Sequence, residues 1–241
     1  RFFFSHYLEL FSGLFMQSKE DADKMNKLTF NPHVHVSGSL KFDVTPPDKQ
    51  YEIVSLLPET PFILAASTHK GEEAVIIQEY KKILDTHPHT SLVIAPRHPH
   101  RAAEVVDIAR KQCLPVTLRS DKVKAKEGVF IIDTVGELMG IFPHCLLVIM
   151  GGTFYSGVGG HNIIEPALFG KCVITGKHME NFRDIFEAFL REDAVIITEP
   201  EIIGITVAEI LVHSSRLKTV GSNARNLVEK EYEIIQAGSG K

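Results

Sequence analysis

Short apolar runs alternate with amphipathic stretches along most of this 241-residue chain. Strands that are buried on both faces give unbroken apolar runs, so this pattern predicts a parallel sheet with helices on both sides. The expected strands are 62–66, 91–95, 129–132, 146–150, 172–174 and 194–197. The expected helices between and after them are 72–84, 101–112, 135–141, 164–169, 182–190, 202–213 and 215–232. The fold class is therefore α/β, with a doubly wound parallel sheet.

The pattern before residue 62 is shorter and ends in a turn-prone break. Strands are expected at 14–17 and 34–36, with a helix at 19–28 between them. Pro46 and Pro47 then interrupt the chain, which indicates a linker. We divide the chain into residues 1–43, a linker at 44–61, and a Rossmann-like domain at 62–241.

Composition excludes several classes of protein. Hydrophobic residues make up 44% and charged residues 23%, and the net charge of −4 gives no general attraction to nucleic acid. The three cysteines fit no zinc or redox spacing. Two His-x-His pairs fall at opposite edges of the predicted sheet, so neither a metal site nor a cofactor is expected. The apolar residues before position 17 are too few and too interrupted to span a bilayer.

The densest motif is the glycine-rich stretch 151–167. It follows an apolar strand, contains five glycines within ten positions, and leads into a helix, which is typical of an anion-binding loop. Asn162 is expected to cap that helix, with Glu165 bonding back to the cap. The stretch matches neither the dinucleotide fingerprint nor the P-loop. A flexible loop before an ordinary capped helix is the alternative interpretation.

Polar residues also follow the other strands, where ligands bind on such sheets. The basic residues expected to surround a phosphodiester are Lys70, Arg97, Arg101, His161 and Lys177. Glu137 and Glu165 are expected to accept hydrogen bonds from ribose hydroxyls. The alternative interpretation of each basic residue is a surface charge in contact with solvent. The alternative for each glutamate is a residue in the first turn of a helix that interacts favourably with the helix dipole.

Four stretches in this order resemble motifs of the 3-deoxy-D-manno-octulosonic acid (Kdo) transferases: 66–73, 95–101, 133–138 and 151–167. Residues 17–21 and 38–43 resemble the end of that family's first domain and its crossover. Ser39, where the family usually has Asn, and Thr153, where Ser is common, are mild departures.

The resemblance implies an inverting GT-B glycosyltransferase with two Rossmann-like domains. The second domain holds CMP-Kdo, and the first holds a lipid A precursor and the glutamate that acts as general base. The family is anchored at the cytoplasmic face of the bacterial inner membrane by an N-terminal segment. Residues 1–43 would be the C-terminal remnant of the acceptor-binding domain. The base, the acceptor surface and the anchor are then expected in a missing N-terminal half, and this chain alone would be soluble and cytoplasmic.

The expected activity is transfer of Kdo from CMP-Kdo to a lipid A precursor, incomplete in this chain. Arg97 and the glycine-loop amides would neutralise the leaving phosphate, Glu165 would hold the ribose, and Ser67 and His69 would face the donor sugar. Two alternatives are a UDP-sugar epimerase-like GT-B enzyme and a non-catalytic donor-domain fragment of a split gene. The expected donor-binding residues are Ser67, His69, Pro96, Arg97, Gly136, Glu137, Gly151, Gly152, Thr153, Gly160, His161, Asn162 and Glu165.

Overall fold

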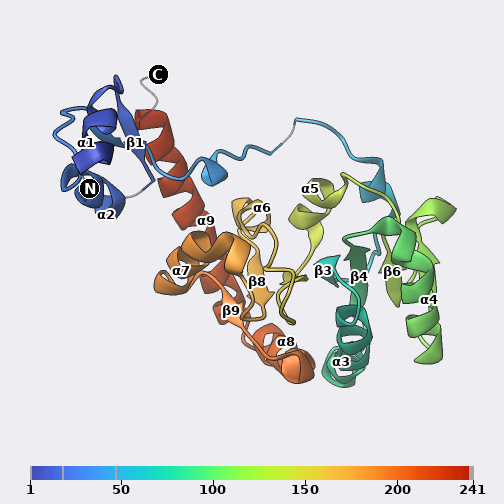
Figure 1. The fold of residues 1–241 in the computed structure, drawn as a ribbon. Helices are drawn as coiled ribbons and strands as arrows, with labels where there is room; N and C mark the ends of the chain where they lie inside the picture. Colours follow the sequence, from blue (N-terminus) through green and yellow to red (C-terminus); the bar gives the residue numbers. More distant parts are fainter. Residues whose placement is uncertain (1, 18, 47, 239–241) are drawn as a thin grey trace. The chain divides into compact units, whose positions relative to one another are not determined.

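The structure is a computed structural model that describes residues 2–17, 19–46 and 48–238. The chain forms two compact units (Figure 1). The first contains the residues up to Thr45 together with those from Asn226 onward, and the second spans Pro46–Arg225. The sequence-based assignment of residues 1–43 to an acceptor domain stays a prediction.

The first unit is built on a small parallel strand pair. Its elements are α1 (Phe2–Glu9), β1 (Leu14–Met16), α2 (Lys19–Asn26), β2 (Val34–Val36), the 3₁₀ turn η1 (Leu40–Phe42) and the end of α9 (Ser214–Gly238). Leu14 lies opposite Val34 in the pair, and α2 connects the two strands. The Asn31 side-chain amide donates to two carbonyls in the α1–β1 segment, which ties the start of the unit to β2. The two strands and α2 were predicted from the sequence, and α1 was not.

The second unit contains a parallel sheet of seven strands. In sheet order they are β5 (Val116–Leu118), β6 (Val129–Ile131), β4 (Ser91–Pro96), β3 (Phe62–Thr68), β7 (Leu147–Met150), β8 (Cys172–Thr175) and β9 (Ile196–Ile197). All six expected strands are confirmed. The sequence pattern missed β5, because it is three residues long, half-buried and at the edge of the sheet.

Helices and short 3₁₀ turns connect these strands. The helices are α3 (Glu72–Thr86), α4 (Ala102–Lys111), α5 (Leu138–Ile141), α6 (Ile164–Leu168), α7 (Arg183–Arg191) and α8 (Ile203–Val212). The 3₁₀ turns are η2 (Glu52–Leu56), η3 (Pro99–Arg101), η4 (Arg119–Asp121), η5 (Phe142–His144), η6 (Glu180–Phe182) and η7 (Pro200–Ile202). The expected linker at 44–61 therefore contains an ordered turn, and its Ile53 is fully buried.

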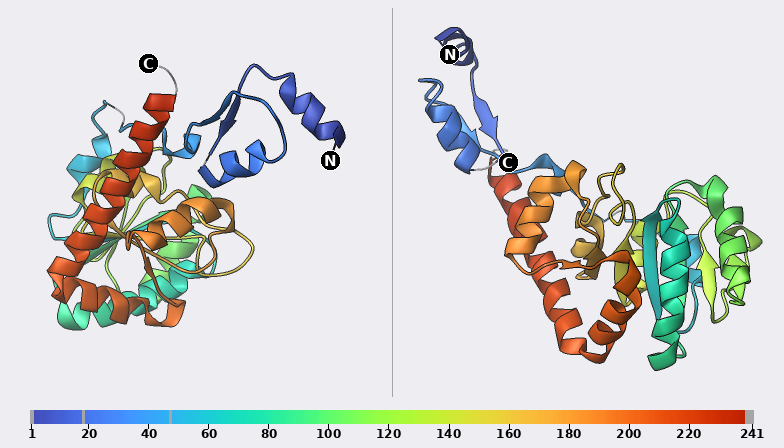
Figure 2. Two further views of the ribbon diagram at one scale, coloured as in Figure 1. Left: turned by 90° about the vertical axis from the view of Figure 1, so that its left-hand side faces the viewer. Right: turned by 60° about the horizontal axis from the view of Figure 1, so that its bottom comes forward.

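Both faces of the large sheet are covered, as the unbroken apolar runs predicted (Figure 2). Ile63, Ile94 and Ile131 pack in one core with the apolar residues of α3, α4 and α8. Leu64 and Val93 alternate with that set along the strands and are also fully buried. In Figure 1, α3 and α8 lie side by side.

The order of the strands sets where loops gather. From β3, the chain first forms one side of the sheet, with β4 next to β3, β5 at the edge and β6 between β4 and β5. It then returns to form β7, β8 and β9 on the other side of β3. The direction of winding therefore reverses between β3 and β7. In open α/β sheets such a reversal leaves a crevice at the carboxyl ends of the strands. Among the described residues, no helix is both long and apolar enough to cross a membrane.

Candidate functional site

Three motif loops leave neighbouring strands at the reversal point. The loop after β3 begins at His69, the loop after β4 at Arg97, and the glycine-rich loop after β7 at Gly151. The strand order β4-β3-β7 places these loops next to one another. The Arg97 amide donates to the Thr68 carbonyl, and the Gly151 amide donates to the Ala66 carbonyl. The sequence-based placement of these motifs at one sheet edge is therefore confirmed.

Two histidines from different loops form a close pair. His69 Nε2 and His161 Nε2 are 2.7 Å apart, and their rings are stacked with centroids 5.0 Å apart. His98 lies edge-on to His69 at 5.9 Å. Burial, followed by His69, lowers the pKa of His161 to about 4, and burial followed by His98 lowers the pKa of His69. At neutral pH the pair is therefore uncharged, and a single proton lies between the two Nε2 atoms.

Arg97 supplies an exposed cation next to this pair. Its guanidinium forms no ion pair with any residue in the described part of the chain. The positive charge of Arg97 nevertheless lowers the pKa of His69, His161 and Glu165, so it lies close to all three. Burial is the largest influence on Glu165 and raises the pKa of its carboxyl group. An anionic ligand would find in Arg97 a guanidinium that does not first have to leave a protein carboxylate.

The start of α6 differs from the capping box predicted from the sequence. The residue before the helix is Ile163, and its side chain provides no cap. The Asn162 Oδ1 atom accepts from the Ile164 amide at 3.0 Å, while its Nδ2 donates to Glu165 Oε1 at 3.2 Å. Glu165 thus bonds back to Asn162 as predicted, but it accepts from the Asn162 side chain rather than from the backbone amide of a capping box. Asn162 thus orients the Glu165 carboxylate.

The glycine loop does not offer its first amides to a ligand. The backbone N–H groups of Gly152 and Thr153 donate to the Glu72 carboxylate at 2.8 and 3.2 Å. The Phe154 amide also donates to it at 3.2 Å. A protein carboxylate therefore already occupies these amides, and the donor-binding roles expected for Gly152 and Thr153 stay predictions. The sequence pattern placed Glu72 at the start of the helix expected at 72–84 but gave it no role.

Several glycines of this loop are required by close packing. A Cβ on Gly151 would lie 2.5 Å from the Ser67 carbonyl oxygen, and one on Gly160 would lie 2.4 Å from the Met179 sulfur. Gly152 has φ +68°, and a Cβ there would meet the His161 ring at 2.9 Å. These glycines let the loop fold back onto β3 and onto the loop after β8. These close contacts account for the glycines without a ligand, and the donor-binding roles expected for Gly151, Gly152 and Gly160 stay predictions.

Thr153 also has a packing role. It is fully buried, and its hydroxyl donates to the Met150 carbonyl at 2.7 Å and accepts from the Gly176 amide at 2.8 Å. The side chain thus connects the end of β7 to the loop after β8. Because the hydroxyl is already engaged on both sides, the expectation that Thr153 contacts a donor is not supported by its geometry.

Three other charged candidates already have protein partners. Arg101 binds Glu73 through both terminal nitrogens and also contacts Glu104, so it is not available to a phosphodiester. Lys177 contacts Glu199 at 3.4 Å. The Glu137 carboxylate accepts from Arg119 at 2.9 and 3.1 Å and from the Thr134 hydroxyl. These bonds give Glu137 a structural role, and its expected ribose role stays a prediction.

The remaining candidates lie where they can approach a ligand. Gly136 is exposed with φ +78°, and no atom lies within 4 Å of a Cβ built on it. Ser67 is half-buried and has φ +55°, next to an irregularity in the β3–β4 register. Pro96 is the last residue of β4 and lies opposite Thr68. Lys70 is exposed. The donor-binding roles of Ser67, His69, Pro96, Arg97, Gly136, His161, Asn162 and Glu165 stay predictions.

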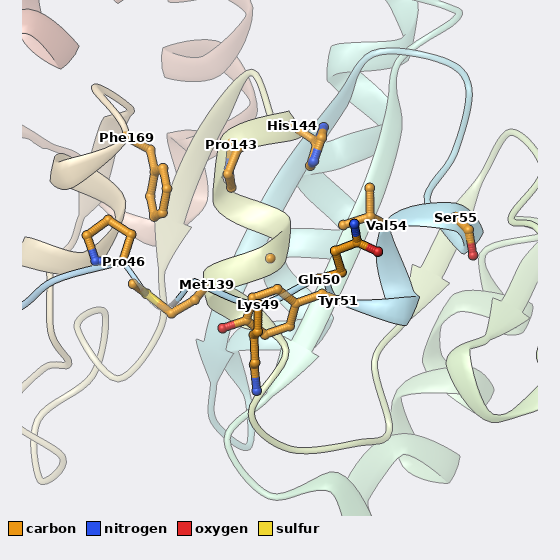
Figure 3. A pocket seen from close by; sticks show the side chains of 11 residues that line it. Pro46, Lys49, Gln50, Tyr51, Val54, Ser55, Met139, Pro143, His144 and Phe169 are labelled. Atoms are coloured by element: carbon orange, nitrogen blue, oxygen red, sulfur yellow. The ribbon is translucent and has the colours of Figure 1, made fainter.

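A cavity of 490 Å³ lies elsewhere in the second unit (Figure 3). It is lined by Pro46, Lys49, Gln50, Tyr51, Val54, Ser55, Met139, Gly140, Pro143, His144 and Phe169. The Tyr51 ring packs against the bare backbone of Gly140, where a Cβ would be 2.4 Å from the ring. None of the candidate site residues lines this cavity, so its size alone does not identify the site.

Curated relatives match this chain over much of its length. No family model matches it. It is 34% identical over 146 residues to the probable mitochondrial 3-deoxy-D-manno-octulosonic acid transferase of Arabidopsis thaliana, covering 59% of this chain and 33% of that one. It is 30% identical to the 3-deoxy-D-manno-octulosonic acid transferase of Rickettsia felis over 97% of this chain and 52% of that one. The chain thus spans about half or less of the length of these relatives.

Solved structures also resemble this chain. The chain resembles the C-terminal CMP-Kdo-binding domain of WaaA from Acinetobacter baumannii with a TM-score of 0.67 and 25% identity. The match covers 70% of this chain and 90% of that domain. A putative UDP-N-acetylglucosamine 2-epimerase from Listeria monocytogenes matches with a TM-score of 0.55 and 13% identity, which shows a shared fold only. The GT-B-type α/β fold predicted from the sequence is confirmed.

Proposed function

We propose that this chain, which is related to the Kdo transferases over nearly its whole length, is the donor-binding half of such an enzyme and binds CMP-Kdo. The observation that carries the proposal is Arg97. It is an exposed cation without an ion-pair partner among the described residues, next to Glu165 and the histidine pair at the reversal point of the sheet. That arrangement matches the needs of a nucleoside monophosphate ester: a cation for the phosphate and a carboxylate for the sugar hydroxyls.

Each residue has a defined task in this proposal. Arg97 pairs with the CMP phosphate through its planar fork and stabilises the negative charge that grows as Kdo leaves. Glu165, oriented by Asn162, accepts hydrogen bonds from the ribose hydroxyls. Ser67 and His69 face the Kdo group, and the bare backbone at Gly136 permits a close approach of the nucleotide. Pro96 ends β4 next to Arg97 and sets the direction of the loop.

The reaction proposed is glycosyl transfer with inversion, from CMP-Kdo to a hydroxyl of a lipid A precursor. Inversion requires a base within hydrogen-bond reach of the attacking hydroxyl. In this proposal Arg97 binds the donor phosphate and Glu165 binds the donor ribose, so neither serves as that base. The base, the acceptor surface and attachment to the inner membrane are therefore proposed to come from the other half of the enzyme, as the resemblance implies.

Nucleotide binding to the 241-residue chain tests this proposal. Isothermal titration calorimetry should detect CMP, with UMP and UDP at least tenfold weaker. Tighter binding of UDP than CMP would favour the epimerase-like alternative. Absence of binding by all three nucleotides would contradict a donor-binding role.

A further inference from the structure

The Glu72 carboxylate lies inside the candidate site and accepts hydrogen bonds from four backbone amides. It is 2% exposed. One oxygen accepts from the amides of His69 and Gly152, both at 2.8 Å. The other accepts from the amides of Thr153 and Phe154, both at 3.2 Å. The β3–α3 turn and the glycine loop are therefore joined through one buried side chain.

These bonds position both members of the histidine pair. Glu72 holds the backbone of His69 directly. It holds His161 indirectly, because the Gly160 amide donates to the Gly152 carbonyl and the His161 ring lies against Gly152. The 2.7 Å approach of the two Nε2 atoms thus depends on the loop conformation that Glu72 fixes.

The neighbouring Glu73 has a different partner, and the difference determines which cation is available. Glu73 is fully buried and takes both terminal nitrogens of Arg101 and the Thr68 hydroxyl. Glu72 is stabilised by amide dipoles alone, without a basic side chain. Two adjacent carboxylates are therefore compensated without drawing on Arg97, which stays available to a ligand.

We propose that Glu72 is a positioning residue of the donor site, which holds the glycine loop and the His69–His161 pair in the geometry that binds the nucleotide. It does not contact the ligand itself. This proposal rests on the proposed function for its effect on CMP, while its effect on the loop can be measured without any ligand.

Glu79 provides a matched control on the same helix. It is also 2% exposed, lies two turns further along α3, and accepts from the Gly204 amide at 3.2 Å and from Lys82 at 2.5 Å. Its partners belong to α8 and α3 rather than to the motif loops. Glu79→Gln therefore removes a buried carboxylate without touching the site.

The first experiment compares CMP affinity in Glu72→Gln and Glu79→Gln at a temperature where both are folded. The carboxamide of Glu72→Gln presents an NH₂ group to two backbone donors, so the loop should shift. We expect Glu72→Gln to weaken CMP binding at least tenfold and Glu79→Gln to change it less than twofold. Equal losses in the two variants, or an affinity within twofold of the wild type in Glu72→Gln, would overturn the proposal.

The second experiment uses the wild-type chain and does not depend on a folded variant. Amide hydrogen exchange followed by NMR should show Gly152, Thr153 and Phe154 protected without ligand and unchanged by CMP. If these amides were protected only after CMP binds, their hydrogen-bond acceptor would be the phosphate rather than Glu72, and the proposal would be overturned. If wild-type protein binds no CMP, the proposed function fails, whereas protection of these amides would still support the role of Glu72 in the loop.

Discussion

The Arg97 guanidinium differs from the other arginines near the site because it is not committed to a carboxylate. Arg101 is held by Glu73 and Glu104, and Arg119 is held by Glu137 and Glu52. In the described part of the chain, a ligand phosphate therefore does not have to break an ion pair to reach Arg97. A charge-assisted hydrogen bond of this kind contributes about 2 kcal/mol.

Arg97→Ala should weaken CMP binding by about 2 kcal/mol, or roughly 30-fold. Arg97→Lys should give a smaller loss, because it keeps the charge but not the planar fork. Calorimetry on the folded variants measures both. Arg110→Ala, an exposed arginine on α4, is the control and should bind CMP normally. Unchanged affinity in Arg97→Ala would show that the Arg97 side chain does not contact the CMP phosphate.

Glu165→Gln should bind CMP less tightly by about 2 kcal/mol while keeping its fold, because the remaining carbonyl oxygen can still accept from Asn162. The variant should lose little more when 2′-deoxy-CMP replaces CMP, since the ribose hydroxyl has then already lost its acceptor. Calorimetry with both nucleotides on wild type and variant gives the comparison. A large additional loss with the deoxy ligand would place the ribose acceptor elsewhere.

The pKa of His161, lowered to about 4, makes the folded protein sensitive to acid. Between pH 6.5 and about 4, the unfolded chain takes up a proton at this position and the folded chain does not, so stability falls as the pH drops through this window. Urea unfolding at pH 7.5, 6.0 and 5.0 should show the decline. His161→Asn should lose less stability than the wild type over the same pH range. An equal loss would show that His161 is not the cause of the acid sensitivity.

At the scale of elements, a buried arginine fastens the turn η2 to the edge of the sheet. Arg119 is 7% exposed and binds Glu137 before α5 and Glu52 in η2. It lies directly after β5, the strand that the sequence pattern missed. Three short elements with little apolar surface of their own are thus joined by one cation.

Arg119→Ala should lower the free energy of unfolding by about 3 kcal/mol, because it leaves the largely buried Glu137 carboxylate without its cation. Chemical denaturation measures this change. Lys124→Ala, which removes an exposed pair with Glu59, should leave stability almost unchanged. If the two variants were equally stable, the Arg119 network would be contributing no more than a surface ion pair.

At the scale of the whole molecule, the division of labour between two domains predicts binding without turnover. The 241-residue chain should bind CMP but transfer no Kdo by itself, because the resemblance places the base and the acceptor surface in the other half. Incorporation of Kdo into a lipid A precursor, with CMP-Kdo generated in the assay, is the measurement. Addition of the N-terminal half, in trans or fused, should restore transfer. Sustained turnover by the chain alone would contradict this division.

The fold of the larger unit was predictable because its strands are buried on both faces. Segments such as 62–66 and 172–174 contain only apolar or small residues. Short runs of this composition are typical of strands that are covered on both faces of a sheet. The placement of the loops after β3, β4 and β7 at one edge followed from the parallel order. By contrast, β5 has only three half-buried residues, so local pattern carried little information about it.

The sequence by itself determined the alternation of strands and helices, the sheet edge where polar loops gather, and the candidate residues in those loops. Only the tertiary structure decided which candidates are available to a ligand. Glu137 and Arg101 have the right chemistry for binding, yet Arg119 and Glu73 neutralise them. The Gly152 amide points to Glu72, 80 positions earlier in the chain. Partners this distant leave no local signal, because a charged or polar group has the same sequence signature whether it meets a ligand or another part of the protein.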